Sequence, residues 1–287
     1  MTATDRNIVR PVFIEGPSGP LFAIHHSSAE GRRSNGAVLY IPPFAEEMNR
    51  SRRMAALQAR ALASRGIDTL LLDLFGTGDS AGDFRDAELT SWFGDIMAAI
   101  AWLEQRGSAL LCLWGLRFGA LLACEAAARW PERIKRLILW QPVLDGKIML
   151  TQFLRIRVAA SMAESSVGEK TEDLRSRLAG GQSIEIAGYE LSAELARALE
   201  DMRIRGLELA SDIRIDWLEV GAEASDTAVP AAQRVIDAWR RDGIAVSAAT
   251  VGGDPFWTLQ ETTLAPALID ATTNLFETCS VRPAKRP

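Results

Sequence analysis

The stretch Leu110–Gly119 reads Leu-Leu-Cys-Leu-Trp-Gly-Leu-Arg-Phe-Gly, and it decides the fold. It is an apolar run that contains two glycines four positions apart, Gly115 and Gly119, and it continues into the small-residue segment Phe118–Arg129. The apolar run predicts a buried strand, and the segment after it predicts a helix. A sharp turn between strand and helix leaves no room for side chains at the two glycine positions. We therefore predict a tight strand–turn–helix unit here.

Arg117 stands between the two glycines, at the position where this kind of turn carries the nucleophile in many hydrolases. In the pattern Gly-x-Ser-x-Gly that position is serine, and cysteine or aspartate can also form a covalent intermediate. A guanidinium group stays protonated at any ordinary pH and cannot attack a carbonyl group. The sequence therefore predicts the geometry of a nucleophile turn without a nucleophile.

Strands and helices alternate on both sides of this turn. Val12–Ile14 and Leu21–His25 flank the turn sequence Gly16–Gly19 and predict an antiparallel hairpin. The elements predicted next are a strand at 37–41, a helix at 49–64, a strand at 69–72, a helix at 88–104, the unit described above and a strand at 134–140. Apolar strands that alternate with helices indicate a parallel sheet that is covered on both faces.

The alternation stops between residues 144 and 210. Helices are predicted there at 148–162, 172–178 and 193–202, with a strand-like segment at 183–191. The rhythm then resumes with a strand at 213–220, a helix at 229–242, a strand at 244–251 and a helix at 259–278. We predict a core of residues 10–143 and 211–280 with an inserted cap subdomain of residues 144–210. The cap either packs on itself or acts as a lid that contacts ligand.

The segment Asp73–Phe84, Asp-Leu-Phe-Gly-Thr-Gly-Asp-Ser-Ala-Gly-Asp-Phe, resembles the loop after the fourth strand of many α/β-hydrolases. Its glycines permit tight turns, and Ser80 can tie the loop to itself. Together with the strand order, this resemblance extends from Val12 to Phe276 and implies the α/β-hydrolase fold, with a mainly parallel eight-stranded sheet. The alternative, a flavodoxin-like fold, would not begin with an antiparallel hairpin.

In that family the catalytic acid follows the next-to-last strand and the histidine follows the last one. Gly221–Pro230 resembles the acid segment and places Asp226 at the acid position, whereas Pro255 stands where the histidine belongs. The chain has only two histidines, His25 and His26, and we expect both to pack on a strand far from that site. Two of the three members of a catalytic triad are therefore absent.

The turn can still offer an anion-binding geometry. The N–H of Phe118 opens the predicted helix, and Phe44 or Ala45 could supply a second donor where an oxyanion hole is usually built. Arg117 adds a positive charge at the same place.

A buried arginine needs an acidic partner. Four acidic residues are predicted at the carboxyl edge of the sheet, where α/β folds bind ligands: Glu46, Glu47, Asp226 and Asp254. We expect Arg117 to lie within salt-bridge reach of one of them, either as an internal ion pair that fills the old active site or as part of an anion site. The residues predicted to contact a ligand in the second case are Arg117, Phe118, Phe44, Ala45, Glu46 and Asp254.

Three further segments resemble a narrower group of proteins. They are Tyr40–Arg53, the turn Trp114–Gly119 with its arginine, and Leu139–Val143 together with Leu150–Leu154. They resemble exosortase A system-associated hydrolases of the second type, from bacteria that make exopolysaccharide and sort proteins with a PEP-CTERM tail. The resemblance implies a cytoplasmic accessory of that system, which binds a small anionic molecule or a partner protein.

Composition sets only broad limits on function. The 287 residues are 48% hydrophobic and 24% charged, which is typical of one large folded domain with or without an insert. The net charge of −5 gives no basic surface for nucleic acid. The sequence contains no apolar stretch long enough to span a membrane and no signal-peptide pattern at Met1–Arg10, so a reducing cytoplasm is the predicted compartment. No metal or cofactor site is predicted.

Three functions are compatible with these observations. The first is a binding or accessory protein with a degenerate active site, and it is favoured because loss of a nucleophile or base costs about six orders of magnitude in kcat in a serine protease. The second is an esterase- or thioesterase-like hydrolase in which a carboxylate of Glu46, Asp226 or Asp254 activates water. The third is an interaction module whose insert forms the interface.

Overall fold

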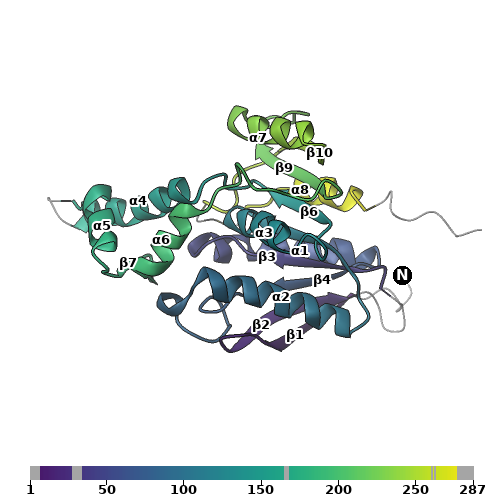
Figure 1. The fold of residues 1–287 in the computed structure, drawn as a ribbon, viewed down its shortest axis with the longest axis horizontal. Coiled ribbons are helices and arrows are strands. Elements are labelled where there is room, and N and C mark those ends of the chain that lie inside the picture. The colour runs from purple at the N-terminus through teal and green to yellow at the C-terminus, as the bar shows by residue number, and fades with distance from the viewer. Residues whose placement is uncertain (1–6, 28–33, 165–167, 260, 262, 277–287) are drawn as a thin grey trace, which may run out of the picture.

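The core of the protein is a single eight-stranded sheet (Figure 1). This computed structural model describes residues 7–27, 34–164, 168–259, 261 and 263–276. The strands are β1 (Ile8–Glu15), β2 (Pro20–Ser27), β3 (Ala37–Ile41), β4 (Asp68–Leu72), β5 (Leu110–Leu116), β6 (Arg136–Trp140), β9 (Arg214–Gly221) and β10 (Ala245–Gly252). Their order across the sheet is β1-β2-β4-β3-β5-β6-β9-β10. β2 runs antiparallel to both of its neighbours and every other pair is parallel. The opening hairpin and the mainly parallel sheet were predicted from the sequence.

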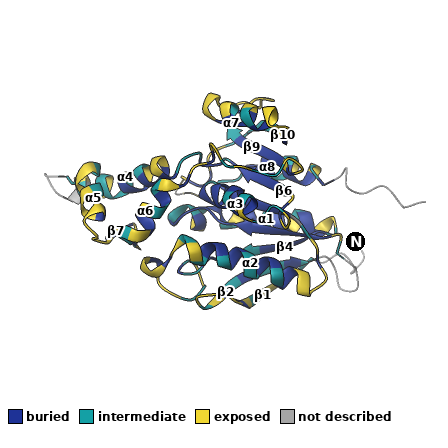
Figure 2. Cartoon of the chain, viewed as in Figure 1, coloured by how far each residue is buried: buried dark blue, intermediate teal, exposed yellow. Residues whose placement is uncertain are grey.

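Helices cover both faces of this sheet. They are α1 (Glu46–Ser64), α2 (Leu89–Gln105), α3 (Phe118–Arg129), α7 (Pro230–Arg241) and α8 (Pro266–Asn274), with the single-turn helix η1 (Phe84–Asp86) before α2. One apolar cluster joins α1 and α8 to one face, and a second cluster joins α2, α3 and α7 to the other. The strands between them are buried on both sides, which is why β3 is apolar at all five positions (Figure 2).

The segment between β6 and β9 lies beyond one end of the sheet, at the left of Figure 1. It contains α4 (Gly146–Glu164), α5 (Thr171–Ala179), the hairpin of β7 (Ile184–Ile186) and β8 (Tyr189–Leu191), and α6 (Ala193–Asp201). Its apolar side chains are buried among one another, with Leu154, Leu174 and Leu199 all inaccessible to solvent. The sequence predicted the three helices, and the strand-like segment at 183–191 is a two-stranded hairpin.

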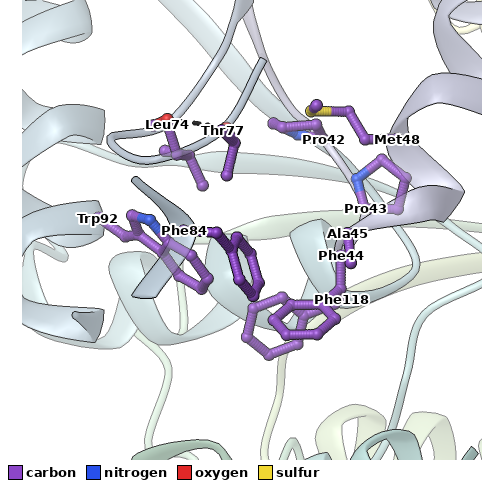
Figure 3. Close-up of a pocket in the computed structure, with 10 residues that line it drawn as sticks. All are labelled: Pro42, Pro43, Phe44, Ala45, Met48, Leu74, Thr77, Phe84, Trp92 and Phe118. Atoms are coloured by element: carbon purple, nitrogen blue, oxygen red, sulfur yellow. Dashed lines mark hydrogen bonds between the residues drawn. The ribbon is translucent and has the colours of Figure 1, made fainter. Parts of the chain in front are cut away.

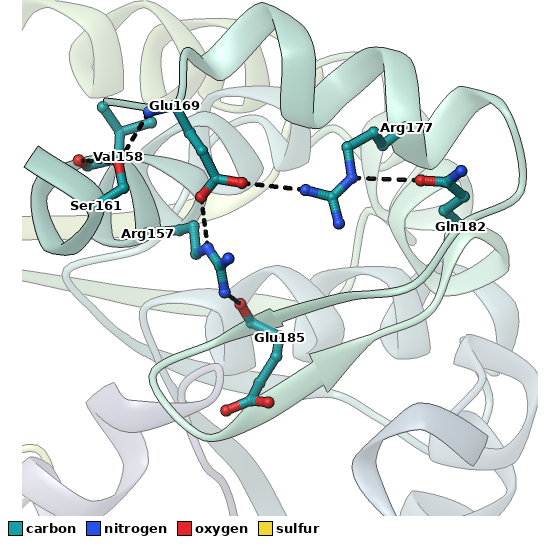
Figure 4. A network of polar contacts seen from close by, with 7 residues as sticks. All are labelled: Arg157, Val158, Ser161, Glu169, Arg177, Gln182 and Glu185. Carbon is teal, nitrogen blue, oxygen red and sulfur yellow. Dashed lines mark hydrogen bonds and ion pairs between the residues drawn. The ribbon is translucent and has the colours of Figure 1, made fainter. Parts of the chain in front are cut away.

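Ion pairs connect the elements of this segment between β6 and β9, which we refer to as the cap (Figure 4). Glu169 accepts from Arg157 of α4 at 2.6 Å and from Arg177 of α5 at 3.1 Å. Arg157 also donates to the backbone carbonyl of Glu185 in β7. These pairs lower the pKa of Glu169, chiefly through the hydrogen bond from Arg157. The side chains of these pairs are 28% to 42% exposed, so solvent screens the ion pairs. The pairs therefore fix how the elements lie and add little to the free energy of unfolding.

Two predicted helix starts are wrong. Helix α1 begins at Glu46 rather than at residue 49, because the turn before it is made by Ala45 with φ 49° and no side chain caps the helix. Helix α8 begins at Pro266 rather than at residue 259. Proline fits the first turn of a helix and disfavours helical backbone in the residue before it, so it sets this start. The helix ends at Asn274, before the end that was predicted at residue 278.

The two histidines lie on β2, as predicted, at the edge of the sheet away from the turn at Arg117. His26 is buried, and burial lowers its pKa to about 4. His25 packs edge-on against Trp102 and lies 3.6 Å from Asp68. Neither imidazole is placed to serve as a base beside Arg117.

Candidate functional site

The turn between β5 and α3 has the strained geometry that the glycine spacing predicts. Arg117 has φ 56° and ψ −116°, a conformation that L-residues rarely adopt. Its N–H donates to the carbonyl of Trp140 at 2.9 Å, and its own carbonyl accepts from Val143 at 3.2 Å. A Cβ atom on Gly119 would collide with the carbonyl of Ile41, and one on Gly115 would collide with the backbone of α3. Contacts on both sides therefore hold Arg117 at the apex of the turn.

The side chain of Arg117 joins three parts of the molecule. Its Nε lies 3.2 Å from Oε1 of Glu47 in the first turn of α1, and its Nη2 lies 3.4 Å from Oε1 of Gln152 on the cap helix α4. Its guanidinium carbon lies 5.6 Å from the ring centre of Trp257, which follows β10. The Arg117 and Glu47 side chains are only 15% and 17% exposed. The ion pair is therefore mostly shielded from water.

Of the four acidic residues that were predicted as possible partners of Arg117, Glu47 forms the ion pair. Glu46 is its neighbour on α1, whereas Asp226 and Asp254 are exposed, and neither forms an ion pair with a residue in the described part of the chain. Asp226 lies after β9 in a loop whose Ser225 pairs with Thr250. The carboxyl at the predicted acid position thus does not join Arg117.

Burial raises the pKa values of both glutamates at the start of α1. For Glu47 the charge of Arg117 opposes this rise, and for Glu46 a hydrogen bond to its own backbone opposes it. Oε2 of Glu46 is buried and has no hydrogen-bond partner among the described residues. The positive end of the helix dipole favours carboxylates in this first turn.

Aromatic rings fill the space behind the turn (Figure 3). The ring of Phe44 lies 5.6 Å from Phe118, 5.4 Å from Phe84 and 5.1 Å from Phe153 of the cap, each edge to face. The cavity that remains has a volume of about 10 Å³. Such a volume holds about one water molecule. Phe44 and Phe118, which were predicted as backbone donors to a ligand, close this pocket with their side chains.

The backbone donors predicted at the turn lie at two helix starts. Phe118 is the first residue of α3, so its N–H has no partner within that helix. Ala45 directly precedes α1 and shares the positive φ of Arg117. The contact of Gly119 with Ile41 brings these two helix starts together. Backbone N–H groups at two neighbouring helix starts are the type of donor from which an oxyanion hole can be built.

Trp257 lies in the loop after the last strand, β10, and its ring lies beside the guanidinium of Arg117. No sequence pattern had indicated a role for this residue. A tight turn, in which Thr258 donates to the carbonyl of Pro255 at 2.9 Å, brings the indole to this place. Arg50 of α1 donates to the carbonyl of Thr258 at 3.1 Å and fixes the turn. An aromatic ring within about 6 Å of a guanidinium stabilises the cation. In the sequence, this contact could have been suspected only from the presence of aromatic residues in the segment after the last strand, Gly252–Trp257.

The loop after β4 forms part of the wall of the small aromatic cavity behind the turn. Ser80 donates to the carbonyl of Asp73 at 2.6 Å and accepts from the N–H of Phe22 at 2.8 Å, so it ties the loop to itself as predicted. Asp95 of α2 accepts from the N–H of Phe75 at 2.8 Å. Its side chain is fully buried, and Oδ1 has no hydrogen-bond partner among the described residues. Burial raises the pKa of Asp95 from 3.8 to about 6.

Asp95 should make the protein less stable as the pH rises. Between about pH 4 and pH 6 the unfolded chain has released this proton and the folded chain still holds it, so the free energy of unfolding falls with pH in this window. The pKa shift corresponds to as much as about 3 kcal/mol above pH 6. Asp95→Asn keeps an oxygen for the N–H of Phe75 and loses the charge. Urea unfolding from pH 4 to 7.5 should therefore show a stability gain in this variant that grows with pH.

The control for this prediction is Asp270→Asn, at an exposed aspartate on α8. Its stability should follow that of the unmodified protein at every pH. Parallel pH profiles for Asp95→Asn and the unmodified protein would show that Asp95 does not titrate as the structure implies.

The sheet order, the strained turn and the helix that follows define an α/β-hydrolase fold. The chain belongs to the serine aminopeptidase S33 family of this fold, whose sequence pattern matches residues 32–185. A search of curated proteins finds no match.

Solved structures with the same fold match over almost the whole chain. The ferulic acid-bound Est1E from Butyrivibrio proteoclasticus is 19% identical, with a TM-score of 0.64 over 92% of this chain and 97% of that one. The α/β-hydrolase GrgF from Penicillium sp. sh18 is 15% identical, with a TM-score of 0.64 over 94% and 98%. A hypothetical protein from Pseudomonas aeruginosa is 16% identical, with a TM-score of 0.62 over 97% and 95%. At these identities the likeness establishes the fold alone.

The part of the chain that the structure describes includes no helix that is both long and apolar enough to cross a membrane.

Proposed function

We propose that this protein binds an anionic ligand without covalent catalysis, through Arg117 at the nucleophile position of an α/β-hydrolase fold. The observation that carries the proposal is the replacement of the nucleophile by an arginine that pairs with Glu47 and lies beside Trp257. A guanidinium with five N–H donors is suited to a carboxylate or phosphate and cannot act as a nucleophile. The N–H of Phe118 adds a donor at the same point.

The ion pair with Glu47 determines where a ligand can reach the guanidinium of Arg117. A ligand carboxylate or phosphate must take the place of Glu47 beside the guanidinium, because the aromatic cavity behind the turn holds only about one water molecule. Approach is open on the side of Gln152, whose side chain is exposed and contacts Nη2 of Arg117. The ligand would thus bind at the seam between core and cap.

The narrower role is an accessory of the exosortase and exopolysaccharide system in the cytoplasm. The resemblance of Tyr40–Arg53, Trp114–Gly119 and Leu139–Val143 to that group of hydrolases supports this assignment. The ligand would then be a small anionic molecule or an acidic group of a protein in that system.

An anion series in a thermal-shift assay tests the proposal. Phosphate should raise the Tm of the unmodified protein, and it should raise the Tm of Glu47→Gln by more, because that variant frees the guanidinium from its internal partner. Arg117→Met should lose the response to phosphate. An equal response to phosphate in Arg117→Met would contradict the proposal, because the anion would then bind elsewhere.

The second candidate is a hydrolase in which a carboxylate activates water, and one observation favours it. Glu46 has a raised pKa and a buried oxygen with no hydrogen-bond partner in the described part of the chain, and both are features of a general base. Release of nitrophenol from p-nitrophenyl acetate that is lost in Glu46→Gln and retained in Asp254→Asn would support this candidate against the first.

A further inference from the structure

A second cavity, of about 280 Å³, lies between helix α1 and the strands β2, β3 and β4. Pro42 and Met48 line both this cavity and the small one behind Arg117, so they form the wall between the two. The rest of its apolar wall comes from Ile24, Ala55, Ala56, Leu71 and Leu72. A dry cavity of about 150 Å³ lined by such side chains holds benzene. The present cavity therefore has room for an apolar group of about ten atoms.

Polar groups lie at one side of this cavity. Tyr40 lines it, is only 5% exposed, and stacks on Trp114 at 4.3 Å between ring centres. Its hydroxyl makes no hydrogen bond with any residue that the structure describes. Burial raises the pKa of Tyr40, so the hydroxyl stays protonated and can donate to a ligand in the cavity.

The charges that line the cavity sum to a positive value. Arg52 donates to Oδ2 of Asp73 at 2.9 Å, and the same oxygen accepts from the N–H of Asp79, so this pair is neutral overall. Arg53 also lines the cavity, is exposed to solvent, and forms no ion pair with a described residue. A hydroxyl donor on the cavity wall that no described residue accepts from, and one unbalanced cation, both favour an anion.

We propose that this cavity is a second ligand site, separate from Arg117, that takes a monocarboxylate with an apolar body of about ten atoms. The carboxylate accepts from the hydroxyl of Tyr40 and faces Arg53, and the hydrocarbon lies against Ala56 and Leu71. A medium-chain fatty acid has this size and this distribution of charge. The proposal does not depend on the function assigned to Arg117.

Isothermal titration calorimetry with octanoate tests it on the full chain. Octanoate should bind in this cavity, and octan-1-ol and octylamine should bind at least about tenfold more weakly, because neither offers an anionic acceptor to Tyr40 and Arg53. Tyr40→Phe should weaken octanoate binding about tenfold, since a hydrogen bond to a charged group is worth roughly that factor in affinity. Absence of octanoate binding, or equal binding of octanol, would overturn the proposal.

Two further variants locate the site. Ala56→Phe, at a half-buried position on α1, fills the cavity and should abolish octanoate binding, with circular dichroism as the check that it folds. In Arg117→Met, which removes the anion site proposed at the turn, octanoate should still bind in this cavity. Binding that survives in folded Ala56→Phe, or that disappears in Arg117→Met, would place octanoate elsewhere and overturn the proposal. If Ala56→Phe does not fold, the result for Tyr40→Phe decides alone.

Discussion

Arg117→Ala should lower the free energy of unfolding by about 3–5 kcal/mol, because it leaves the carboxylate of Glu47 buried without its partner. Both side chains are less than one fifth exposed, so water screens this pair little. Arg117→Met should lose less, because it keeps the volume beside Trp257 and because Glu47, whose pKa burial raises, can take up a proton. For the same reason the loss in both variants should be smaller at pH 4 than at pH 7.

Urea unfolding at both pH values measures these differences. The matched control is Arg133→Ala, which removes an exposed arginine that lies 2.8 Å from Glu104, and it should change stability by less than about 1 kcal/mol. Arg117→Gly should be more stable than Arg117→Ala by about 1 kcal/mol, since glycine adopts φ 56° without strain. A loss in Arg117→Ala no larger than that in the control would contradict a buried ion pair.

The second prediction is that Arg117→Ser does not gain ester-hydrolase activity. This variant restores the serine of the nucleophile turn, yet its ester hydrolysis should stay at the background rate. The missing base alone costs about six orders of magnitude in kcat in a serine protease, and Trp257 fills the space beside the turn. Release of nitrophenol from p-nitrophenyl acetate measures the rate.

The double variant Arg117→Ser with Trp257→His is the matched comparison. It adds an imidazole beside the new hydroxyl and should hydrolyse the ester faster than the single variant does. Turnover by Arg117→Ser alone, at the rate of an ordinary serine hydrolase, would show that a base other than histidine already serves the turn.

The fold could be predicted because its strongest constraints are local. Gly115 and Gly119 meet the backbone of neighbouring elements, and no other residue fits at these positions. The apolar strands and the opening hairpin then fixed the order of elements along the chain. The start of α1 could not be predicted, because Ala45 makes the turn through its backbone and leaves no capping side chain to recognise.

The site was predictable in position but not in its contacts. Arg117 was evident from its place between two glycines, whereas the choice of Glu47 over Asp226 depends on where α1 begins and how the loop after β9 runs. Trp257 was missed because the position after the last strand that faces Arg117 was assigned to Pro255. The turn from Pro255 to Thr258 instead places Trp257, two residues later, beside the guanidinium. The cavity beside Tyr40 depends on packing between α1 and three strands, which no local pattern encodes.

The central claim is that the nucleophile position of this hydrolase fold carries an ion-paired arginine and no nucleophile takes its place. Mass spectrometry of the intact, native protein after treatment with a fluorophosphonate probe tests this claim most directly. We predict that the mass stays unchanged, because both histidines of the chain lie on β2 and neither lies beside the turn to activate a serine. A stoichiometric adduct on any serine, including Ser80 in the loop after β4, would contradict it.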